Sequence, residues 1–334
     1  MGHLWTHKTF RGLGTLAGCA ALTFVVAACS GSSSGSASTA SHSSASSLEE
    51  TNVTVGAQPV ADAAALYIAQ KDGYFRQVGL NVHIIPVAQS TKAIPDMLHG
   101  TVDIIGGAND VSFIQADAGG VSIKILADAA HCTADSFEVM TLPGSGITSA
   151  ASLAGKTVGI NVPNDVQAVT LNEVLEADGV NYKSVHYVQV PFPDVVEELK
   201  DHKIDAFSGI EPYISAAEEQ LGAVPVLSQC TGPTAGFPMS GYFSTSAWAG
   251  KNPNTVKAFQ TAIDKAQALI DGDSQALRQI LPTYTTITSN MADVLNLDTY
   301  PTSVSPSAMQ DVATLLETQR LLSTKFSVSS MMVP

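Results

Sequence analysis

Two aspartates stand at matching places in two similar stretches of the chain, and each has two chemical uses. Asp62 opens the helix-like stretch 63–75, and Asp165 opens the stretch 166–179, each shortly after a proline. An aspartate at such a position caps a helix by accepting a backbone N–H of the first turn. The same helix start can instead present N–H groups to a ligand anion. The two uses compete, because a capping carboxylate fills part of the anion site, and the sequence leaves both open.

Further polar residues follow predicted strands. Asn109 and Asp110 follow the pair Gly106-Gly107 after one intervening residue, and glycine lets the backbone approach a ligand closely. The Asn109 side chain offers both a donor and an acceptor, although a simple turn from strand to helix is the alternative. Glu211 occupies the equivalent place in the second half, since both residues come six positions after an aspartate that begins a strand. Asn109 and Glu211 are therefore candidate ligand contacts.

The charged residues near these strand ends are mostly acids. Asp62, Asp110, Asp165 and Glu211 lie there, whereas Lys92 is the one base close to a predicted loop. A small hard anion is usually met by a base or by several N–H donors. A neutral or weakly cationic heterocycle, or a zwitterion with an amine, is therefore as good a candidate solute as a sulfonate. The solute stays open.

The sequence gives no pattern for metal binding or catalysis. Its histidines form no H-x-x-x-H arrangement and do not pair with nearby acids as metal ligands do. No Walker A sequence or dinucleotide-binding glycine fingerprint occurs. The G-x-S-x-G match at 31–35 has no strand before it and no helix after it. We expect no catalytic residue, no cofactor and no metal.

The elements that would position the candidate residues alternate between strands and helices. The predicted strands cover residues 53–57, 81–87, 102–107 and 121–128, then 156–161, 184–190, 204–209 and 224–228. Strands that alternate with helices form largely parallel sheets with right-handed crossovers, so the sequence predicts an α/β protein with two lobes. Ligands of such sheets bind beyond the carboxyl ends of the strands. Those ends are the loops 58–62, 88–91, 107–112, 161–166, 191–194 and 209–213.

The N-terminal residues have the layout of an export signal. Lys8 and Arg11 precede a stretch without charge that runs from residue 12 to residue 28, which is typical of a secretory signal peptide. Residues 26–29, Val-Ala-Ala-Cys, resemble the bacterial lipobox, so we expect cleavage after residue 28 and a lipid on Cys29. The Ser/Gly-rich residues 29–50 then form a flexible tether. An ordinary signal peptide cut elsewhere is the alternative.

Charge and cysteine usage narrow the function further. Removing residues 1–28, which hold two bases and no acid, changes the net charge from −14 to −16. Nucleic acid is excluded as a partner, because its phosphates require a basic surface. With Cys19 removed and Cys29 lipidated, Cys132 and Cys230 remain, and an even pair in an exported protein predicts a disulfide. A metal site with His131 is the alternative.

Several stretches together resemble a known family. They are YIAQKDGYFRQVGLNVHII, MLHGTVDIIGG, SLAGKTVGIN, ELKDHKIDAFSGIEPYISAAEEQLGA and SVSPSAMQDVATLLETQRLLSTKFSV. Their order and spacing, from about residue 52 to residue 328, are similar to the periplasmic-type solute-binding proteins of ABC importers. The branch is the one with binders of taurine, alkanesulfonate, nitrate and thiamine precursors.

The resemblance implies a two-lobed periplasmic-binding-protein-like fold (type II) with mixed, largely parallel sheets. It places lobe I at 51–140 plus 241–334 and lobe II at 141–240, with hinge crossovers near Pro143-Gly144 and between Pro238 and Gly241. The predicted disulfide would lie near this hinge. The implied candidate ligand-binding residues are Gln58, Asp62, Ser90, Thr91, Asn109, Asp110, Asn164, Asp165, Phe192, Glu211 and Tyr213. Ser240 is a further candidate outside the predicted loops.

The function implied is that of a non-enzymatic receptor. Anchored by lipid to the outer face of the bacterial cell membrane, a monomer would capture a small solute and deliver it to an ABC permease and its ATPase. A solute-sensing lipoprotein adaptor is one alternative. An enzyme of the thiamine-pyrimidine-synthesis type on the same fold is another, which the export signal disfavours.

Overall fold

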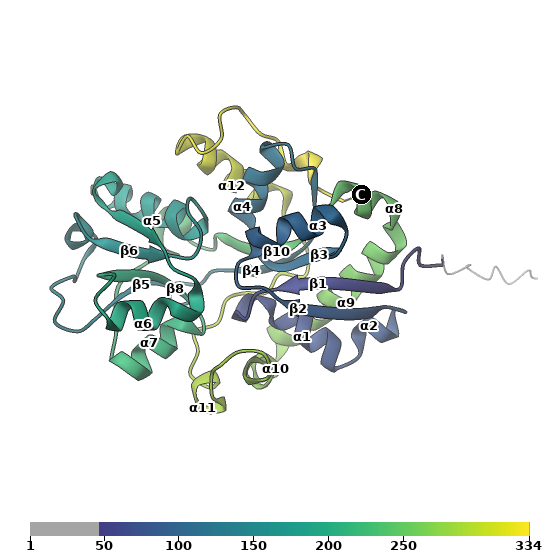
Figure 1. Cartoon of the computed structure of the whole chain (residues 1–334), viewed down its shortest axis with the longest axis horizontal. Coiled ribbons are helices and arrows are strands. Elements are labelled where there is room, and N and C mark those ends of the chain that lie inside the picture. The colour runs from purple at the N-terminus through teal and green to yellow at the C-terminus, as the bar shows by residue number, and fades with distance from the viewer. Residues whose placement is uncertain (1–46, 334) are drawn as a thin grey trace, which may run out of the picture. The chain divides into compact units, whose positions relative to one another are not determined.

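The structure is a computed structural model that describes residues 47–333. The predicted signal peptide, Cys29 and residues 29–46 of the predicted tether lie outside the described residues. Two five-stranded sheets with helices packed against them form the described part (Figure 1). No helix among residues 47–333 is both long enough and apolar enough to cross a membrane.

The first sheet has the strand order β2-β1-β3-β10-β4. Strand β1 pairs in parallel with β2 and β3, whereas β10 runs antiparallel to β3 and β4. Its strands are β1 (Asn52–Ala57), β2 (Asn81–Pro86), β3 (Ile104–Asn109), β4 (Ile123–His131) and β10 (Pro238–Thr245). Its helices are α1 (Ala64–Lys71), α2 (Tyr74–Gln77), α3 (Ile94–His99), α4 (Asp110–Ala118), α8 (Ser246–Lys251), α9 (Pro253–Gly272), α10 (Ser274–Ile280), α11 (Ser289–Ala292) and α12 (Pro306–Thr318).

The second sheet repeats this plan with the order β7-β6-β8-β5-β9. Strand β6 pairs in parallel with β7 and β8, and β5 runs antiparallel to β8 and β9. Its strands are β5 (Phe137–Thr141), β6 (Thr157–Ile160), β7 (His186–Gln189), β8 (Ala206–Ile210) and β9 (Val224–Ser228). Its helices are α5 (Val166–Ala177), α6 (Val195–Lys200) and α7 (Tyr213–Leu221). The two-lobed α/β fold expected from the sequence is confirmed.

A matched pair of aspartates fixes the same strand pairing in both sheets. The Asp103 carboxylate accepts the N–H of Thr54 at 2.8 Å, and the Asp205 carboxylate accepts the N–H of Thr157 at 2.8 Å. In each pair the aspartate N–H also donates to the threonine carbonyl, at 2.9 Å. The sequence repeat therefore reflects one local structure built twice.

Burial of one helix face holds the first lobe together. In α9, Val256, Phe259 and Ile263 are buried, and this spacing places them on one side of the helix. Phe259 packs against Phe75 and Tyr242, with ring centroids 5.4 and 5.6 Å apart. Burying each large apolar side chain contributes about 1.5–3 kcal/mol, so this face anchors α9 to the sheet.

The eight strands expected from the sequence are all present, and two further strands were missed. These are β5 and β10, the antiparallel strand in the interior of each sheet. Because β5 belongs to the second sheet and β10 to the first, the chain passes between sheets at residues 132–136 and 229–237. Both crossings precede the expected boundaries at 140/141 and 240/241. The Pro143-Gly144 turn follows β5 and does not join the sheets.

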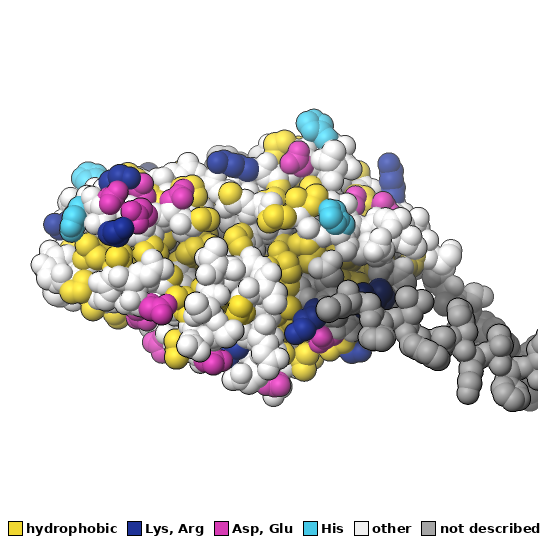
Figure 2. Space-filling model, turned by 60° about the horizontal axis from the view of Figure 1, so that its bottom comes forward, with side chains coloured by type: hydrophobic (Ala, Val, Ile, Leu, Met, Phe, Trp, Pro, Cys, Tyr) yellow, Lys and Arg dark blue, Asp and Glu magenta, His cyan; other side chains and the backbone are white. Residues whose placement is uncertain are grey.

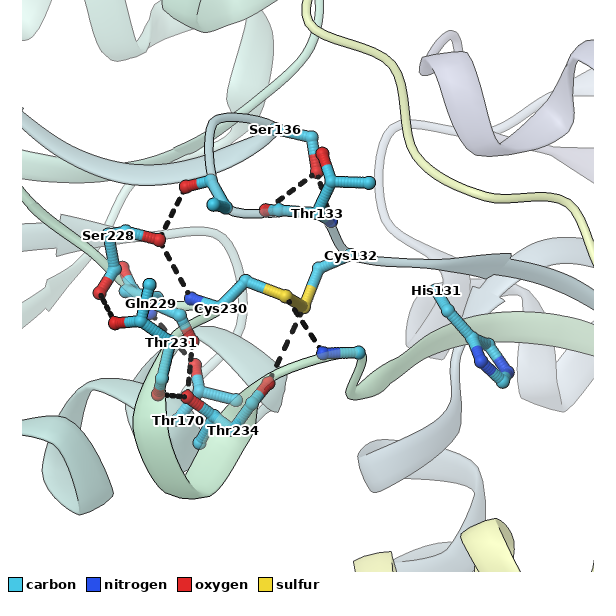
Figure 3. Close-up of a disulfide and its surroundings, with 12 residues drawn as sticks. His131, Cys132, Thr133, Ser136, Thr170, Ser228, Gln229, Cys230, Thr231 and Thr234 are labelled. Carbon is cyan, nitrogen blue, oxygen red and sulfur yellow. Dashed lines mark hydrogen bonds between the residues drawn. A yellow bond between two sulfur atoms is a disulfide. The ribbon is translucent and has the colours of Figure 1, made fainter.

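The predicted disulfide joins the two crossings. Cys132 lies on the first and Cys230 on the second, with Cα atoms 5.9 Å apart, and both are buried. Figure 3 shows the bond between the two segments, with Thr234 beside it. It closes a chain segment with a sequence separation of 98 residues. The disulfide therefore ties together the two connections on which the lobes would pivot.

The last residues assigned to the tether contact the folded body. The Glu49 carboxylate accepts the backbone N–H groups of Asn254 and Thr255, at 3.0 and 3.1 Å, at the start of α9. The Glu50 carboxylate accepts the Trp248 indole N–H at 2.9 Å. The structured body thus begins a few residues before the expected boundary at residue 51.

Replacing both cysteines with alanine should lower the free energy of unfolding by about 2–4 kcal/mol, because the cross-link restricts the unfolded chain. Urea denaturation of the wild type and of the Cys132→Ala/Cys230→Ala variant measures the difference. Reductant should lower the stability of the wild type by a similar amount and leave the variant unchanged. A loss below about 0.5 kcal/mol, the range of an ordinary surface change, would contradict this role.

Candidate functional site

A cavity lies between the two sheets, and both lobes line it. It contains about 360 Å³ of space between atoms. The lobes are held against each other around it by direct hydrogen bonds. The lining residues are Gln58, Val60, Asp62, Gly107, Asn109, Asn161, Asp165, Val166, Gln167, Phe192, Ile210, Met239 and Ser240.

The cavity lies at the carboxyl ends of the parallel strands in both sheets. Gln58 follows β1, Asn109 ends β3, Asn161 follows β6 and Ile210 ends β8. This is the edge at which parallel sheets bind ligands. Five of the six loops predicted from the sequence contribute lining residues, and the loop 88–91 does not.

Two wider hollows lie on the first lobe, and they are weaker candidates for a binding site between the lobes. Lys257 and Gln260 line both, together with other residues of the first lobe only. A change in the arrangement of the lobes would not open or shut them. The cavity at the carboxyl ends of the parallel strands of both lobes is therefore the candidate site.

Asn109 and Asp165 connect the lobes directly across the cavity. The Asn109 amide N–H donates to the Asp165 carboxylate at 3.2 Å. The Asn109 side-chain oxygen also accepts the N–H of Ser112 and so caps α4. Each residue therefore starts a helix of its own lobe and bonds to the other lobe at the same time.

Two further bonds between the lobes flank this contact. The Gln89 amide donates to the carbonyl of Asn161, and the Gln115 amide donates to the carbonyl of Asn164 at 2.9 Å. On the outside of the cavity, the Gln319 amide at the end of α12 donates to the carbonyl of Val169 at 2.8 Å. Closure is thus held by direct protein contacts on several sides.

The structure separates the two matched aspartates. Asp165 caps α5, because its carboxylate accepts the N–H groups of Gln167 and Ala168 at 3.0 and 3.3 Å. Asp62 caps no helix; its carboxylate accepts the Ser240 hydroxyl at 2.7 Å, and its second oxygen, Oδ1, is buried without a partner. The capping use therefore applies to Asp165 and not to Asp62.

Burial changes the proton affinity of both groups. It raises the pKa of Asp165 to about 7, although the N–H groups of Ala168 and Gln167 act in the opposite direction. Burial also raises the pKa of Asp62, partly offset by the Ser240 hydroxyl. Both carboxyl groups would be stabilised in their charged form by a cation.

Glu211 and Tyr213 lie behind the cavity rather than in its lining. The Glu211 carboxylate accepts the Ser215 hydroxyl at 2.9 Å and the N–H of Asn296 at 3.1 Å. The Tyr213 ring stacks on Phe192, with centroids 5.2 Å apart. Both were candidate ligand contacts, yet the structure gives them supporting positions: one fixes the loop and the other holds the aromatic wall.

Four other candidates also lie outside the lining. Ser90 is buried, Thr91 is half-buried, and Asn164 is exposed with a backbone φ of 58°. Asp110 is fully buried at the first position of α4, where neither carboxylate oxygen has a partner. The lining retains Gln58, Asp62, Asn109, Asp165 and Phe192 from the candidate set, together with Ser240.

Sequence reasoning missed the remaining lining residues. Most of them have apolar or amide side chains. Their position close to a candidate residue in the sequence was the only feature that could have indicated a place in the lining. Met239 is next to the further candidate Ser240, but the sequence did not predict β10, the strand to which both belong. The residues missed are Val60, Gly107, Asn161, Val166, Gln167, Ile210 and Met239.

No group of three or more His, Cys, Asp or Glu side chains suited to a metal ion occurs among residues 47–333. The lining combines carboxylates and amides with an apolar wall. Such a surface can hold a small solute by hydrogen bonds and apolar contact.

Comparisons with known proteins agree with this geometry. A nitrate/nitrite binding protein from Nostoc is 26% identical over 258 residues, which are 70% of this chain and 57% of that protein. A formylaminopyrimidine-binding protein from Halalkalibacterium halodurans is 29% identical over 147 residues, 43% of each chain. The chain thus spans about half the length of these curated relatives.

A solved structure supports the fold independently. The alkanesulfonate-binding protein of Xanthomonas axonopodis pv. citri, solved with bound MOPS, superimposes with a TM-score of 0.73 at 16% identity. The match covers 86% of this chain and 99% of that one. The NMT1/THI5-like family matches residues 60–273, which is more than half of the 334 residues. The chain belongs to the NMT1/THI5-like family and has the fold of periplasmic solute-binding proteins.

Proposed function

We propose that this protein is the extracytoplasmic receptor of an ABC importer. It captures a small solute in the interlobe cavity and delivers it to a permease and its ATPase. The observation that carries the proposal is a cavity lined by both lobes and closed by direct bonds between them, above all Asn109 to Asp165. The names of the related binding proteins support it.

Closure supplies the signal that such a receptor needs. Bonds between the lobes form only when the cavity is shut, and a solute that touches both lobes favours that state. The permease would then recognise the closed form. The disulfide between the two crossings keeps the pivot short while the lobes move about it.

The proposal includes a membrane anchor and a monomeric receptor. A lipid on Cys29 would hold the protein at the outer face of the cell membrane, with the serine-rich residues as a tether. The net charge of −14 makes nucleic acid an unsuitable partner. On the face shown in Figure 2, Lys and Arg side chains lie scattered, and many lie beside acids.

A thermal-shift screen tests the receptor function. The solutes are nitrate, taurine, alkanesulfonates, pyrimidines, riboflavin and polyamines. A true ligand at 100 times its dissociation constant should add about 2.7 kcal/mol to stability. In the variant Asn109→Ser, the serine hydroxyl can still accept the Ser112 N–H at the start of α4. The serine side chain is too short to reach Asp165. The variant should bind about tenfold more weakly, through loss of one charged hydrogen bond.

The matched control is Asn290→Ala, an exposed asparagine on α11, which should bind like the wild type. If no solute in the screen raises the melting temperature, the receptor function fails. It also fails if Asn109→Ser and Asn290→Ala bind a hit equally well.

Gln319→Ala tests closure separately from the cavity. Gln319 bonds across the lobes to the Val169 carbonyl at 2.8 Å and to the Asn172 amide at 3.0 Å. Loss of two such bonds should cost the closed state about 1–2 kcal/mol. Because the solute binds to the closed state, a less stable closed state lowers the affinity. A cost of about 1–2 kcal/mol corresponds to an affinity roughly 5- to 30-fold weaker. Calorimetry with a hit from the screen measures this.

Gln310→Ala is the matched control on the same helix. Gln310 bonds to Phe326 and Val328, within the first lobe. It should cost stability but not affinity. Equal loss of affinity in both variants would show that Gln319 acts through folding and not through closure.

A further inference from the structure

The cavity that we propose as the solute site has acidic side chains and no basic ones. Its lining contains Asp62 and Asp165 and no Lys, Arg or His. Asp165 is engaged on both oxygens, by helix α5 and by Asn109. Asp62 is engaged on one oxygen only. Among the lining side chains, the fully buried polar atom without a hydrogen-bond partner is an acceptor, Asp62 Oδ1.

Four side-chain donors of the lining are directed at the protein itself. The Gln58 amide donates to the carbonyl of Ala88 at 3.2 Å, and the Gln167 amide to the carbonyl of Ser208. The Ser240 hydroxyl donates to Asp62, and the Asn109 amide to Asp165. An anion entering here would compete for these donors and would face two carboxylates.

The surroundings of Asp62 provide no opposite charge. Asp110, which is buried, and Asp298, which is half-buried, both repel it, and burial is the largest cause that raises the pKa of each. The salt bridges among residues 47–333 involve other groups: His131 with Asp128, and Lys200 at the end of α6 and Lys203 just after it with nearby acids. A buried carboxylate without a partner is costly, so a cation at Oδ1 would be strongly favoured.

The rest of the lining suits an organic cation. Val60, Val166, Ile210 and Met239 provide apolar surface. Phe192 adds an aromatic side chain, supported from behind by Tyr213, and cations are attracted to aromatic faces. The closed cavity is small, so the cationic group must be compact.

We propose that the solute bears a compact cationic nitrogen, such as an amine or an amidine, that pairs with Asp62 Oδ1 inside the cavity. The proposal rests on the receptor function and narrows it. We therefore expect solutes that place an anionic group next to Asp62 to bind less tightly than solutes that place a cationic group there. Asp62 is the residue that sets this preference, and Asp165 is the residue that closes the cavity.

Two sets of probes with the same shape and different charge test the proposal. They are acetamidine, acetamide and acetate, and benzamidine, benzamide and benzoate, each titrated up to 20 mM at constant ionic strength. In at least one set we expect the amidine to bind at least tenfold more tightly than the amide, and the carboxylate not to bind. In Asp62→Asn the amidine should lose this advantage, because asparagine keeps a hydrogen-bonding oxygen but no charge.

Asp96→Asn, on the exposed side of α3, changes the net charge equally and should leave the order of the probes unchanged. A melting temperature for Asp62→Asn at or above the wild-type value shows that the variant is folded. The proposal is overturned if the amide or the carboxylate binds as tightly as the amidine, or if no probe binds. It is also overturned if Asp62→Asn keeps the preference for the amidine.

The receptor function fails on different evidence. If nitrate or an alkanesulfonate binds and Asn109→Ser weakens it, the protein is a receptor and only the cation preference is wrong. If no solute in the earlier screen binds, the receptor function itself is wrong.

Discussion

The closed arrangement of two lobes depends on how the chain passes between its sheets. It crosses at residues 132–136 and 229–237, and the disulfide between Cys132 and Cys230 holds these crossings together. With the pivot fixed there, the carboxyl ends of β1, β3, β6 and β8 meet across one gap. Most lining residues are placed by that constraint, because they lie at or just beyond the ends of these strands.

Buried acids are the second theme of the molecule. Asp62 and Asp110 are buried and Asp298 is half-buried, none of them has a basic partner among residues 47–333, and desolvation raises the pKa of each. Such groups reduce stability unless something balances their charge. Groups whose pKa values are strongly shifted cluster at functional sites. Their position at and behind the cavity links this cost to the binding site.

The internal repeat shows how similar sequences acquire different uses. Asp103 and Asp205 form the same bonds in both sheets, because each contacts only its own neighbouring strand. Asp62 and Asp165 also stand at matching positions, yet only Asp165 caps a helix. Asp62 instead accepts the hydroxyl of Ser240 in β10, the strand that the chain forms after it crosses back from the second lobe. The hydrogen bonds between neighbouring strands are therefore the same in both halves, whereas the long-range contacts differ.

The sequence alone determined the α/β class, eight strands, the cysteine pair and five of the loops that line the cavity. These features depend on short-range periodicity, on turn residues and on the direction of parallel strands. Tertiary structure decided what no local pattern carries: the interior strands β5 and β10, the crossing points, and the supporting positions of Glu211 and Tyr213. Met239 and Ser240 join the site only because β10 pairs with β3, placing Ser240 opposite Asn109. Pairing between segments more than a hundred residues apart depends on packing of the whole lobe, and so only the folded chain reveals it.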